Sequence, residues 1–313
     1  MAWGAAAGVL PDLDLVGLAS ADPLAEFRHH RTLTHALWFG PALGPLLGAA
    51  VARFYRRRDG AGGPEQLQAW VGLFVVALFT HPLLDLFTSY GTQLLWPHPR
   101  RFALDAVAII DPFYSLPLAG ALALALWVRQ PARRARLAIA SLLVGTVYLF
   151  YTLWLNQRAE DEVRRQIAAG VQAQVSCYPT LFQPWLRRVV VRDGERISVG
   201  AISLWRPHVV RWQHHREPRD ARIDAARATD HGRLFEWFAM GQTAARVTPA
   251  GDAVEIDDLR YGYFEHPGHG LWGVRLALDA EGRPRGAAQR YNRRPQDRSS
   301  LVRRLWQATF FPG

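Results

Sequence analysis

The chain has 313 residues, a formal net charge of +10 and apolar residues at half of its positions. Such a length can bury at least one large core and predicts two domains. The single cysteine, Cys177, excludes an internal disulfide and a thiolate-rich metal site, and we expect it to be a buried apolar thiol.

Four apolar stretches occupy the first half of the chain: Ala36 to Ala52, Leu67 to Thr80, Ser115 to Val128, and Leu137 to Leu155. A bilayer span takes about 20 residues, with a range of roughly 17 to 25. The last stretch meets this length, the first lies at its lower limit, and the other two reach it with flanking residues. Each alone could be a buried core helix. Together, with basic loops between them, they predict a membrane bundle of about four spans.

The loops predict the orientation of this bundle. "RFYRRR" follows the first stretch and "RQPARRAR" joins the third to the fourth. Short arginine-rich loops stay on the cytoplasmic side, and long domains translocate largely regardless of their charge. We therefore expect everything after Asn156 to lie outside the cytoplasm. The opening "MAWGAAAG" resembles the end of a helix whose beginning is absent, which would be a truncated fifth span.

The residues after Asn156 change character. "QRAEDEVRRQIAAGVQAQ" has helical periodicity and predicts a continuation of the last span. Two runs of β-forming residues flank Asp193 and Gly194, which is a strong hairpin signal. Further strands are expected in "AVEIDDLRYGYF" and "LWGVRLALDAEGRP", with some helix at 233–240. We predict an α+β protein: a helical membrane domain at 1–156, a helical linker at 157–180 and a small, mainly antiparallel β domain at 181–313.

Four polar clusters interrupt the apolar half, where ionisable residues are costly and usually functional. They are Asp12 with Asp14, the run "HHRTLTH" with His29, His30, Arg31 and His35, then His81 with Asp85, and finally Asp105 with Asp111. The predicted topology places the last three at the outer face of the membrane. The first joins them if it ends a helix that runs outward. We therefore expect the clusters to converge on one surface.

Imidazole and carboxylate groups together suit Zn, with Mn as the second choice. His81 and Asp85 are four residues apart and share one face of a helix. His30 and His35 can point to a common centre if Thr32 or Thr34 caps a helix between them. Asp12 and Asp14 would face the same way in an extended segment after Pro11. The number of carboxylates makes a site with more than one metal plausible.

Structural roles compete with this interpretation. His30 and His35 could be interfacial histidines with satisfied hydrogen bonds, and His29 could be exposed. Asp85 could pair with an arginine, Asp14 could be a solvated turn residue, and Asp111 before Pro112 could be a helix N-cap. Arg31 could neutralise carboxylates or orient an anionic substrate group, and we favour the second role.

The sequence resembles a bacterial family of membrane-bound, metal-dependent hydrolases, the YdjM type. The segments that carry the resemblance are "GVLPDLDL", "HRTLTHALW", "HPLLDLFTSYGTQLLWP" and "RFALDAVAIIDPFYSLPL", with "YPTLFQPWLRRVVV" and "DLRYG" further on. The family usually has a Thr-His or Thr-Gln element before "PDLD" and a glycine where this chain has Thr32. The fold it implies is distantly similar to zinc-dependent phospholipase C and single-strand nuclease helical domains, which makes phosphoesters the expected substrate class.

The resemblance implies roles for eight residues of this chain. We expect the metal ligands to be Asp12, Asp14, His30, His35, His81 and Asp85. We assign catalytic roles to Asp14, Arg31 and Asp111, with Arg31 also contacting substrate.

The leading hypothesis is an integral hydrolase of the bacterial inner membrane that uses a divalent metal. Its substrate would be a phosphoester or a lipid-linked molecule, approached at the outer face of the membrane. The alternative is a transporter or ion-handling protein that uses the same His/Asp cluster. Nucleic-acid binding is a weaker alternative, because loop orientation accounts for the arginines and no motif for such binding is evident. The lipid bilayer is the expected partner.

Overall fold

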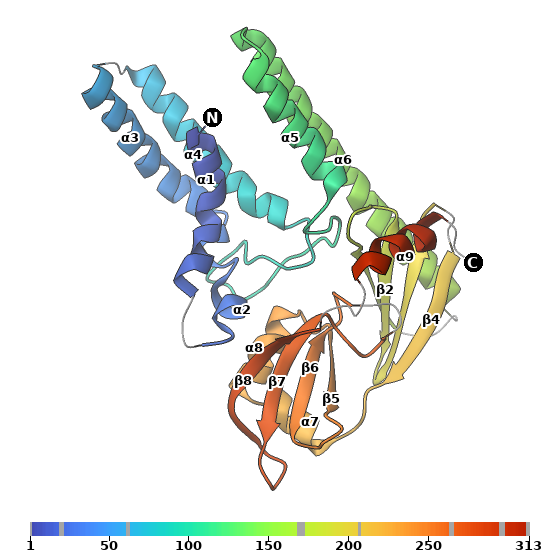
Figure 1. Cartoon of the computed structure of the whole chain (residues 1–313). Coiled ribbons are helices and arrows are strands. Elements are labelled where there is room, and N and C mark those ends of the chain that lie inside the picture. Colours follow the sequence, from blue (N-terminus) through green and yellow to red (C-terminus); the bar gives the residue numbers. More distant parts are fainter. Residues whose placement is uncertain are drawn as a thin grey trace. The chain divides into compact units, whose positions relative to one another are not determined.

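The computed structural model describes residues 2–18, 22–60, 63–167, 173–205, 208–262, 266–293 and 298–310. It contains two compact units (Figure 1). The first unit comprises Met1–Leu86 and Tyr90–Ala103, and the second comprises Phe87–Ser89 and Leu104–Gly313. The boundary therefore falls within the loops around residues 87–104.

The first unit is helical (Figure 1). Its elements are α1 (Ala2–Val9), the 3-10 helix η1 (Leu10–Leu18), α2 (Ala25–His29), the 3-10 helix η2 (Leu33–His35), α3 (Phe39–Asp59) and α4 (Pro64–Asp85). α3 ends at Gly60, whose φ of 65° closes the helix in the left-handed conformation that glycine adopts without strain. Pro64 then begins α4 at a position where its missing N–H costs nothing.

Glycines every fourth residue let α3 and α4 pack closely. Gly40, Gly44 and Gly48 are all buried along one face of α3. A Cβ added at Gly44 would lie 2.7 Å from the backbone nitrogen of Val75 on α4. Small residues at this spacing allow two helix backbones to approach in a membrane, where van der Waals contact replaces the hydrophobic effect as the driving force. This contact fixes the position of α4 against α3.

Length and composition identify two to three membrane spans among the described residues. α4 and α6 (Pro131–Gln166) each suffice to cross a bilayer, and a third span results if Ala25–His35 and α3 count as one segment bent by 68°. α5 (Pro112–Trp127) is apolar but has 16 residues. All four expected stretches are helical, but the expected count of four spans is not confirmed.

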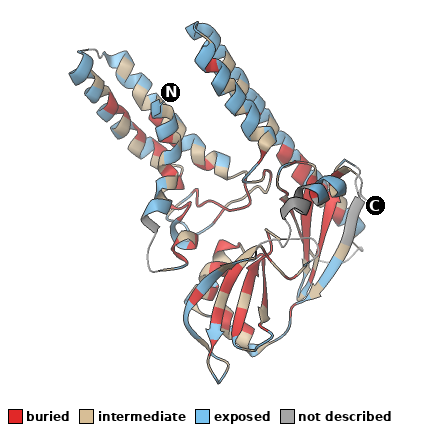
Figure 2. Cartoon of the chain, in the orientation of Figure 1, coloured by how far each residue is buried: buried red, intermediate tan, exposed pale blue. Residues whose placement is uncertain are grey.

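The second unit begins with α5 and α6, which pair with one another. Large apolar side chains such as Leu116, Trp127, Leu142 and Val147 are exposed on these helices, which appear pale blue in Figure 2. Exposed apolar surface of this extent is costly in water and is normal in lipid. α6 continues to Gln166, beyond its apolar part, as the sequence predicted.

Two four-stranded antiparallel sheets follow, in the orders β1-β2-β3-β4 and β5-β6-β7-β8. Their strands are β1 (Gln174–Pro179), β2 (Leu186–Asp193), β3 (Arg196–Ser203), β4 (His208–Arg216), β5 (Thr243–Val247), β6 (Ala253–Asp258), β7 (Trp272–Leu278) and β8 (Pro284–Asn292). Three helices accompany them: α7 (Ala221–Arg227), α8 (Asp230–Phe238) and α9 (Arg298–Phe310).

The cores of the two sheets are apolar and buried (red in Figure 2). Val189 and Val191 of β2 pack with Cys177, which is free and fully buried as expected, and with Ala159 and Val163 of α6. On the other side of the strand, Val190 packs with Leu259, which follows β6. The α6 helix and both sheets therefore share one continuous packed structure.

The sequence predicted most of these elements. The hairpin at Asp193-Gly194 joins β2 to β3, with Gly194 at a φ of 57°. The expected helix at 233–240 is α8. One β domain was expected where the structure has two sheets, and β1 lies inside the range assigned to a helical linker. The segment after Pro11 is a 3-10 helix, so its prediction as extended chain was wrong; the fixed φ of Pro11 suits the first turn of a helix equally well.

Candidate metal centre

Four residues of the first unit form a group that could hold a metal ion: Asp12, His35, His81 and Asp85. Asp12 lies on η1, His35 ends η2, and His81 and Asp85 lie in the last turns of α4. The spacing of four residues puts the last two on one face of α4, as predicted. The close contact of α3 with α4 brings His35, just before α3, towards that face.

The donor atoms of this group all lie within 4.8 Å of one another, and five of their six separations match the edges of a tetrahedral metal site. His35 Nε2 lies 3.2 Å from Asp85 Oδ2, 3.2 Å from His81 Nε2 and 3.3 Å from Asp12 Oδ1. His81 Nε2 lies 3.4 Å from Asp12 Oδ1 and 3.6 Å from Asp85 Oδ2. Zinc binds N and O ligands at about 2.0–2.2 Å, which gives tetrahedral edges of about 3.3–3.6 Å. Two imidazole nitrogens and two carboxylate oxygens therefore fit a zinc ion.

Hydrogen bonds present the Nε2 atoms of both imidazoles to this centre. His81 Nδ1 donates to the carbonyl oxygen of Gly8 at 2.9 Å. His35 Nδ1 lies 2.9 Å from Thr34 Oγ1, and that hydroxyl donates to Asp14 Oδ2 at 2.9 Å. Because the Thr34 proton is used by Asp14, His35 Nδ1 is the donor in its pair. Metal-ligating histidines in proteins are oriented by such bonds to the second ring nitrogen.

Asp14 and His30 lie beside the four-residue group and bind one another. His30 Nδ1 donates to Asp14 Oδ1 at 2.8 Å, and both side chains are largely buried. The His30 ring packs edge-to-face against His35, with ring centroids 5.5 Å apart. Asp14 thus supports both His30 and, through Thr34, His35.

Arg31 pairs with Asp85 from outside the group. Its Nη2 lies 3.0 Å from Asp85 Oδ1, while Oδ2 of the same carboxylate faces the histidines. The guanidinium lies over the ring of Tyr90 at 4.8 Å. Arg31 has a φ of 60°, a conformation that is uncommon for a residue with a side chain and is often found at functional sites.

The pKa values of Asp12 and Asp14 are both lowered. Hydrogen bonds from His35 and His81 hold the pKa of Asp12 well below its usual range. Burial alone would raise the pKa of Asp14, but its hydrogen bond with His30 outweighs this effect, and the pKa is lowered. Burial alone would lower the pKa of His35, but hydrogen bonds with Asp12 and Asp85 outweigh this effect, and the pKa is raised. A divalent cation at this centre would take the place of the proton that these carboxylates favour on His35.

The fourth polar cluster belongs to the second unit. Asp111 is the N-cap of α5: Oδ1 accepts from Phe113 N at 2.9 Å and from Tyr114 N at 3.3 Å. Its Oδ2 accepts from the Tyr148 hydroxyl at 2.8 Å. The capping role considered for Asp111 is therefore confirmed. Asp105 is also in this unit, and burial raises its pKa to about 6.

Some features of the site escaped the sequence analysis. Thr34 was considered as a helix cap, but it bonds Asp14 and His35; Thr32 precedes η2 without a capping bond from its side chain. Gly8 acts through its backbone, which carries no sequence signal. The Tyr90 ring packs against His30, a contact between segments 60 residues apart. His29 is exposed, as expected.

Comparisons with known proteins agree with the membrane assignment. The chain is 25% identical over 195 residues to an uncharacterized protein, YfhP, of Bacillus subtilis (strain 168), covering 61% of this chain and 54% of the relative. It thus spans about half the length of that protein. No solved structure matches the chain. The model of the YdjM inner membrane protein family matches residues 1–159, and the chain belongs to this family.

Proposed function

We propose that the protein is a metal-dependent hydrolase of the inner membrane whose ligands are Asp12, His35, His81 and Asp85. The observation that carries this proposal is the set of four donor atoms that lie within 4.8 Å of one another. Two imidazoles and two carboxylates suit zinc best, with manganese as the second candidate. Cys177, fully buried in the second unit, does not compete for the ion.

A bound divalent metal would supply Lewis acidity and lower the pKa of a water ligand towards neutrality. The protein's own contribution is to orient groups and to move protons. We assign proton transfer to His30, which Asp14 holds in one tautomer through its Nδ1 proton. This pairing leaves His30 Nε2 as the proton-accepting atom.

Arg31 has two roles in this proposal. Its bond to Asp85 Oδ1 turns Oδ2 towards the histidines. Its planar guanidinium suits an anionic substrate, because such a group can bind a phosphoryl group through two parallel hydrogen bonds. We therefore propose a phosphoester as the substrate class.

The polar residues lie at helix ends, which favours an enzyme over a transporter. His81 and Asp85 are in the last turns of α4, and Asp12 and His35 are outside the long helices. Transporters place their ion-binding residues near the middle of broken spans. An enzyme whose site lies at the membrane surface is consistent with the observed positions.

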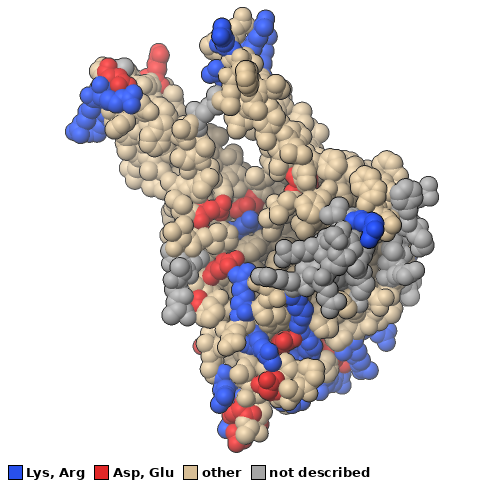
Figure 3. Space-filling view, in the orientation of Figure 1, with Lys and Arg blue, Asp and Glu red and all other residues tan. Residues whose placement is uncertain are grey.

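We also propose that the site and the C-terminal domain are extracytoplasmic. Arginine side chains gather at the α3–α4 tip and, separately, at the α5–α6 tip, away from the apolar helix surfaces (blue in Figure 3). These tips hold Arg56 to Arg58 and Arg133 to Arg136. Positively charged short loops remain in the cytoplasm.

A labelling experiment tests this orientation. Cys177 is fully buried and gives little background, so Asp59→Cys and Glu281→Cys serve as single reporters at the α3–α4 tip and at the β7–β8 turn. In intact spheroplasts, a membrane-impermeant maleimide should label Glu281→Cys, and should label Asp59→Cys only after lysis. The reverse pattern contradicts the proposal.

Activity is tested with p-nitrophenyl phosphate and bis-p-nitrophenyl phosphate on detergent-purified protein. Chelation should abolish hydrolysis, and zinc or manganese should restore it. Asp14→Asn and His30→Gln should retain metal and lose most of the rate, whereas His29→Gln, which changes an exposed neighbour, should match wild type. Hydrolysis that survives in Asp12→Ala and His81→Ala would rule out the proposed centre.

A further inference from the structure

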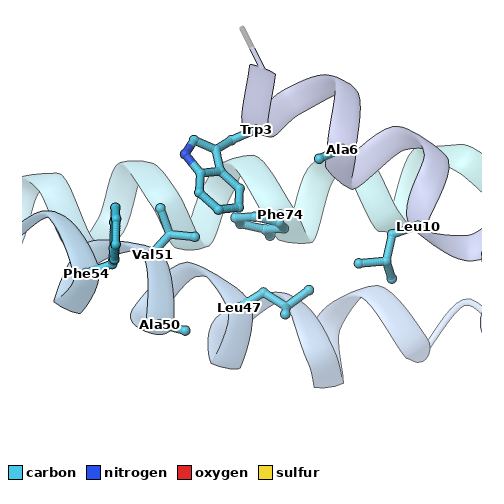
Figure 4. A pocket seen from close by; sticks show the side chains of 8 residues that line it. All are labelled: Trp3, Ala6, Leu10, Leu47, Ala50, Val51, Phe54 and Phe74. Atoms are coloured by element: carbon cyan, nitrogen blue, oxygen red, sulfur yellow. The ribbon is translucent and has the colours of Figure 1, made fainter.

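An apolar pocket of about 330 Å³ lies in the first unit between α1, α3 and α4 (Figure 4). Trp3 and Ala6 of α1, Leu47 and Ala50 of α3, and Phe74 of α4 line it. Its lining is almost wholly hydrocarbon, so it suits neither an ion nor a polar head group. These helices belong to the membrane bundle, where the surrounding molecules are the hydrocarbon chains of lipids.

One end of the pocket is lined by a residue close in sequence to a candidate metal ligand. Figure 4 shows the lining side chains arranged along the helices, from Phe54 at one end to Leu10 at the other. Leu10 precedes the ligand Asp12 by two residues, on the same 3-10 helix. The elements that line the pocket therefore also carry or adjoin the ligands: η1 bears Asp12, α4 bears His81 and Asp85, and α3 follows His35.

The opposite part of the pocket is bounded by aromatic side chains. Trp3 Nε1 donates to the Tyr55 hydroxyl at 3.1 Å, and Tyr55 stacks on Trp70 with ring centroids 5.6 Å apart. Trp3 also packs edge-to-face against Phe74. These contacts hold the Trp3 ring in place as one wall.

We propose that this pocket binds the hydrocarbon tail of an amphiphilic phosphoester whose head group reaches the metal centre. The proposal rests on the proposed function and names its substrate as a lipid. At about 30 Å³ for a group the size of water, the volume holds on the order of ten methylene groups. Because the tail would come from an apolar bilayer, van der Waals contact with the pocket lining, and not transfer from water, would favour its binding.

Photo-cross-linking tests the pocket independently of hydrolysis. The probe is a long-chain alkyl phosphonate, which is not hydrolysed, with a diazirine near the end of its chain. The matching alkyl alcohol has the same tail without the anionic head group. With zinc present, the phosphonate should label peptides that contain Trp3 to Leu10 and Leu47 to Phe54 roughly tenfold or more above the alcohol.

Two adjacent substitutions provide the matched comparison. Ala50→Phe fills the pocket, whereas Ala49→Phe adds the same ring at a neighbouring exposed position of α3 that does not line it. Ala50→Phe should abolish the phosphonate-dependent labelling and retain metal and the hydrolysis of p-nitrophenyl phosphate. Ala49→Phe should behave as wild type.

Equal labelling by phosphonate and alcohol would overturn the proposal, because it would identify the occupant as bulk bilayer lipid. Unchanged labelling in Ala50→Phe would overturn it as well. Selective labelling without hydrolysis of any ester would leave the tail site standing and reject the hydrolase. Hydrolysis of p-nitrophenyl phosphate without selective labelling would reject the tail site alone.

Discussion

The two units treat buried charge in opposite ways. In the second unit, Asp258 and Arg260 are fully buried and pair through two bonds of 2.9 and 2.7 Å. Nearby, Arg246 and Arg293 together contact Asp257 and Glu255, so cations and anions are matched. In the first unit, Asp12 and Asp14 pair with histidines, and Asp85 pairs with His35 and Arg31.

This difference distinguishes the structural ion pairs of the second unit from the candidate metal centre of the first. A buried ion pair whose charges balance holds segments of a protein together, and Arg260 also donates to the Ser89 carbonyl at 2.9 Å. Arg187, which is buried in the same unit, donates to the backbone carbonyl of Ala106 at 2.7 Å. A cluster of carboxylates and histidines whose Nε2 atoms face a common centre can take up either a proton or a metal ion. Residue type alone does not distinguish a structural ion pair from a candidate metal site. The partners of each charged side chain distinguish them.

The largest expected effect comes from removing one partner of the buried ion pair between Asp258 and Arg260. Arg260→Met leaves Asp258 buried without its partner and removes the bond to Ser89, so we expect a loss of about 3–5 kcal/mol in the free energy of unfolding. The control Arg275→Met removes an exposed pair with Asp252 and should cost about 0–1 kcal/mol. Unfolding midpoints in detergent measure both. Equal costs would contradict the contrast between buried and exposed pairs.

A pH dependence should follow from Asp105, which is buried near Arg260 and Arg187 in the second unit. Burial raises its pKa from 3.8 to about 6, although the Arg260 and Arg187 guanidinium groups act in the opposite direction. The folded state therefore binds the proton more tightly, and stability falls as pH rises from about 4 through 6, by up to about 3 kcal/mol.

Asp105→Asn removes this titration and should reduce the fall in stability between pH 4 and 6. Asn is also well suited to the φ of 50° at this position. Denaturant unfolding at several pH values compares the variant with wild type. Parallel pH profiles would show that Asp105 does not carry the effect.

The contact between α3 and α4 is expected to support the site from a distance. Gly44→Val places a side chain against the backbone of Val75 and should cost about 1–3 kcal/mol, with weaker metal retention because His35 and His81 move apart. Gly72→Val adds the same group on α4, where a Cβ has no described heavy atom within 4 Å. Thermal stability and metal content should fall in the first variant only.

The mildest expected change concerns the orientation of His35. Thr34→Val removes the hydroxyl that links His35 Nδ1 to Asp14, and the metal affinity should drop roughly 10- to 100-fold without loss of the fold. Thr80→Val is the control, because that hydroxyl bonds the carbonyl of Val76 within its own helix. Metal affinity can be measured by competition with a chromophoric chelator. An unchanged affinity in Thr34→Val would mean that the link is unimportant.

Local rules predicted much of the site. The spacing of four residues correctly put His81 and Asp85 on one helix face, and the basic loops separated apolar stretches that are indeed helical. The glycines at positions 40, 44 and 48 were visible in the sequence, but the need for them arises only from the helix that packs against them. Thr34 and Gly8 act through contacts between distant segments, so no local pattern could have assigned them.

The second unit was harder to predict for the same reason. Its hairpin at Asp193-Gly194 is a local feature and was found. The burial of Arg187 and Arg260 is not a local feature, because arginine is rarely buried unless other segments supply its partners. Those partners come from the loops around Ser89 and Ala106, 171 and 81 residues away in sequence.

Elemental analysis of the detergent-purified protein tests the central claim most directly. Wild type and His29→Ala should each contain about one zinc or manganese ion per chain, following the four-ligand group. His35→Ala and His81→Ala should lose that metal while retaining the unfolding midpoint of the second unit. Metal-free wild type, after exposure to zinc and manganese, or full metal content in both ligand variants, would contradict the account.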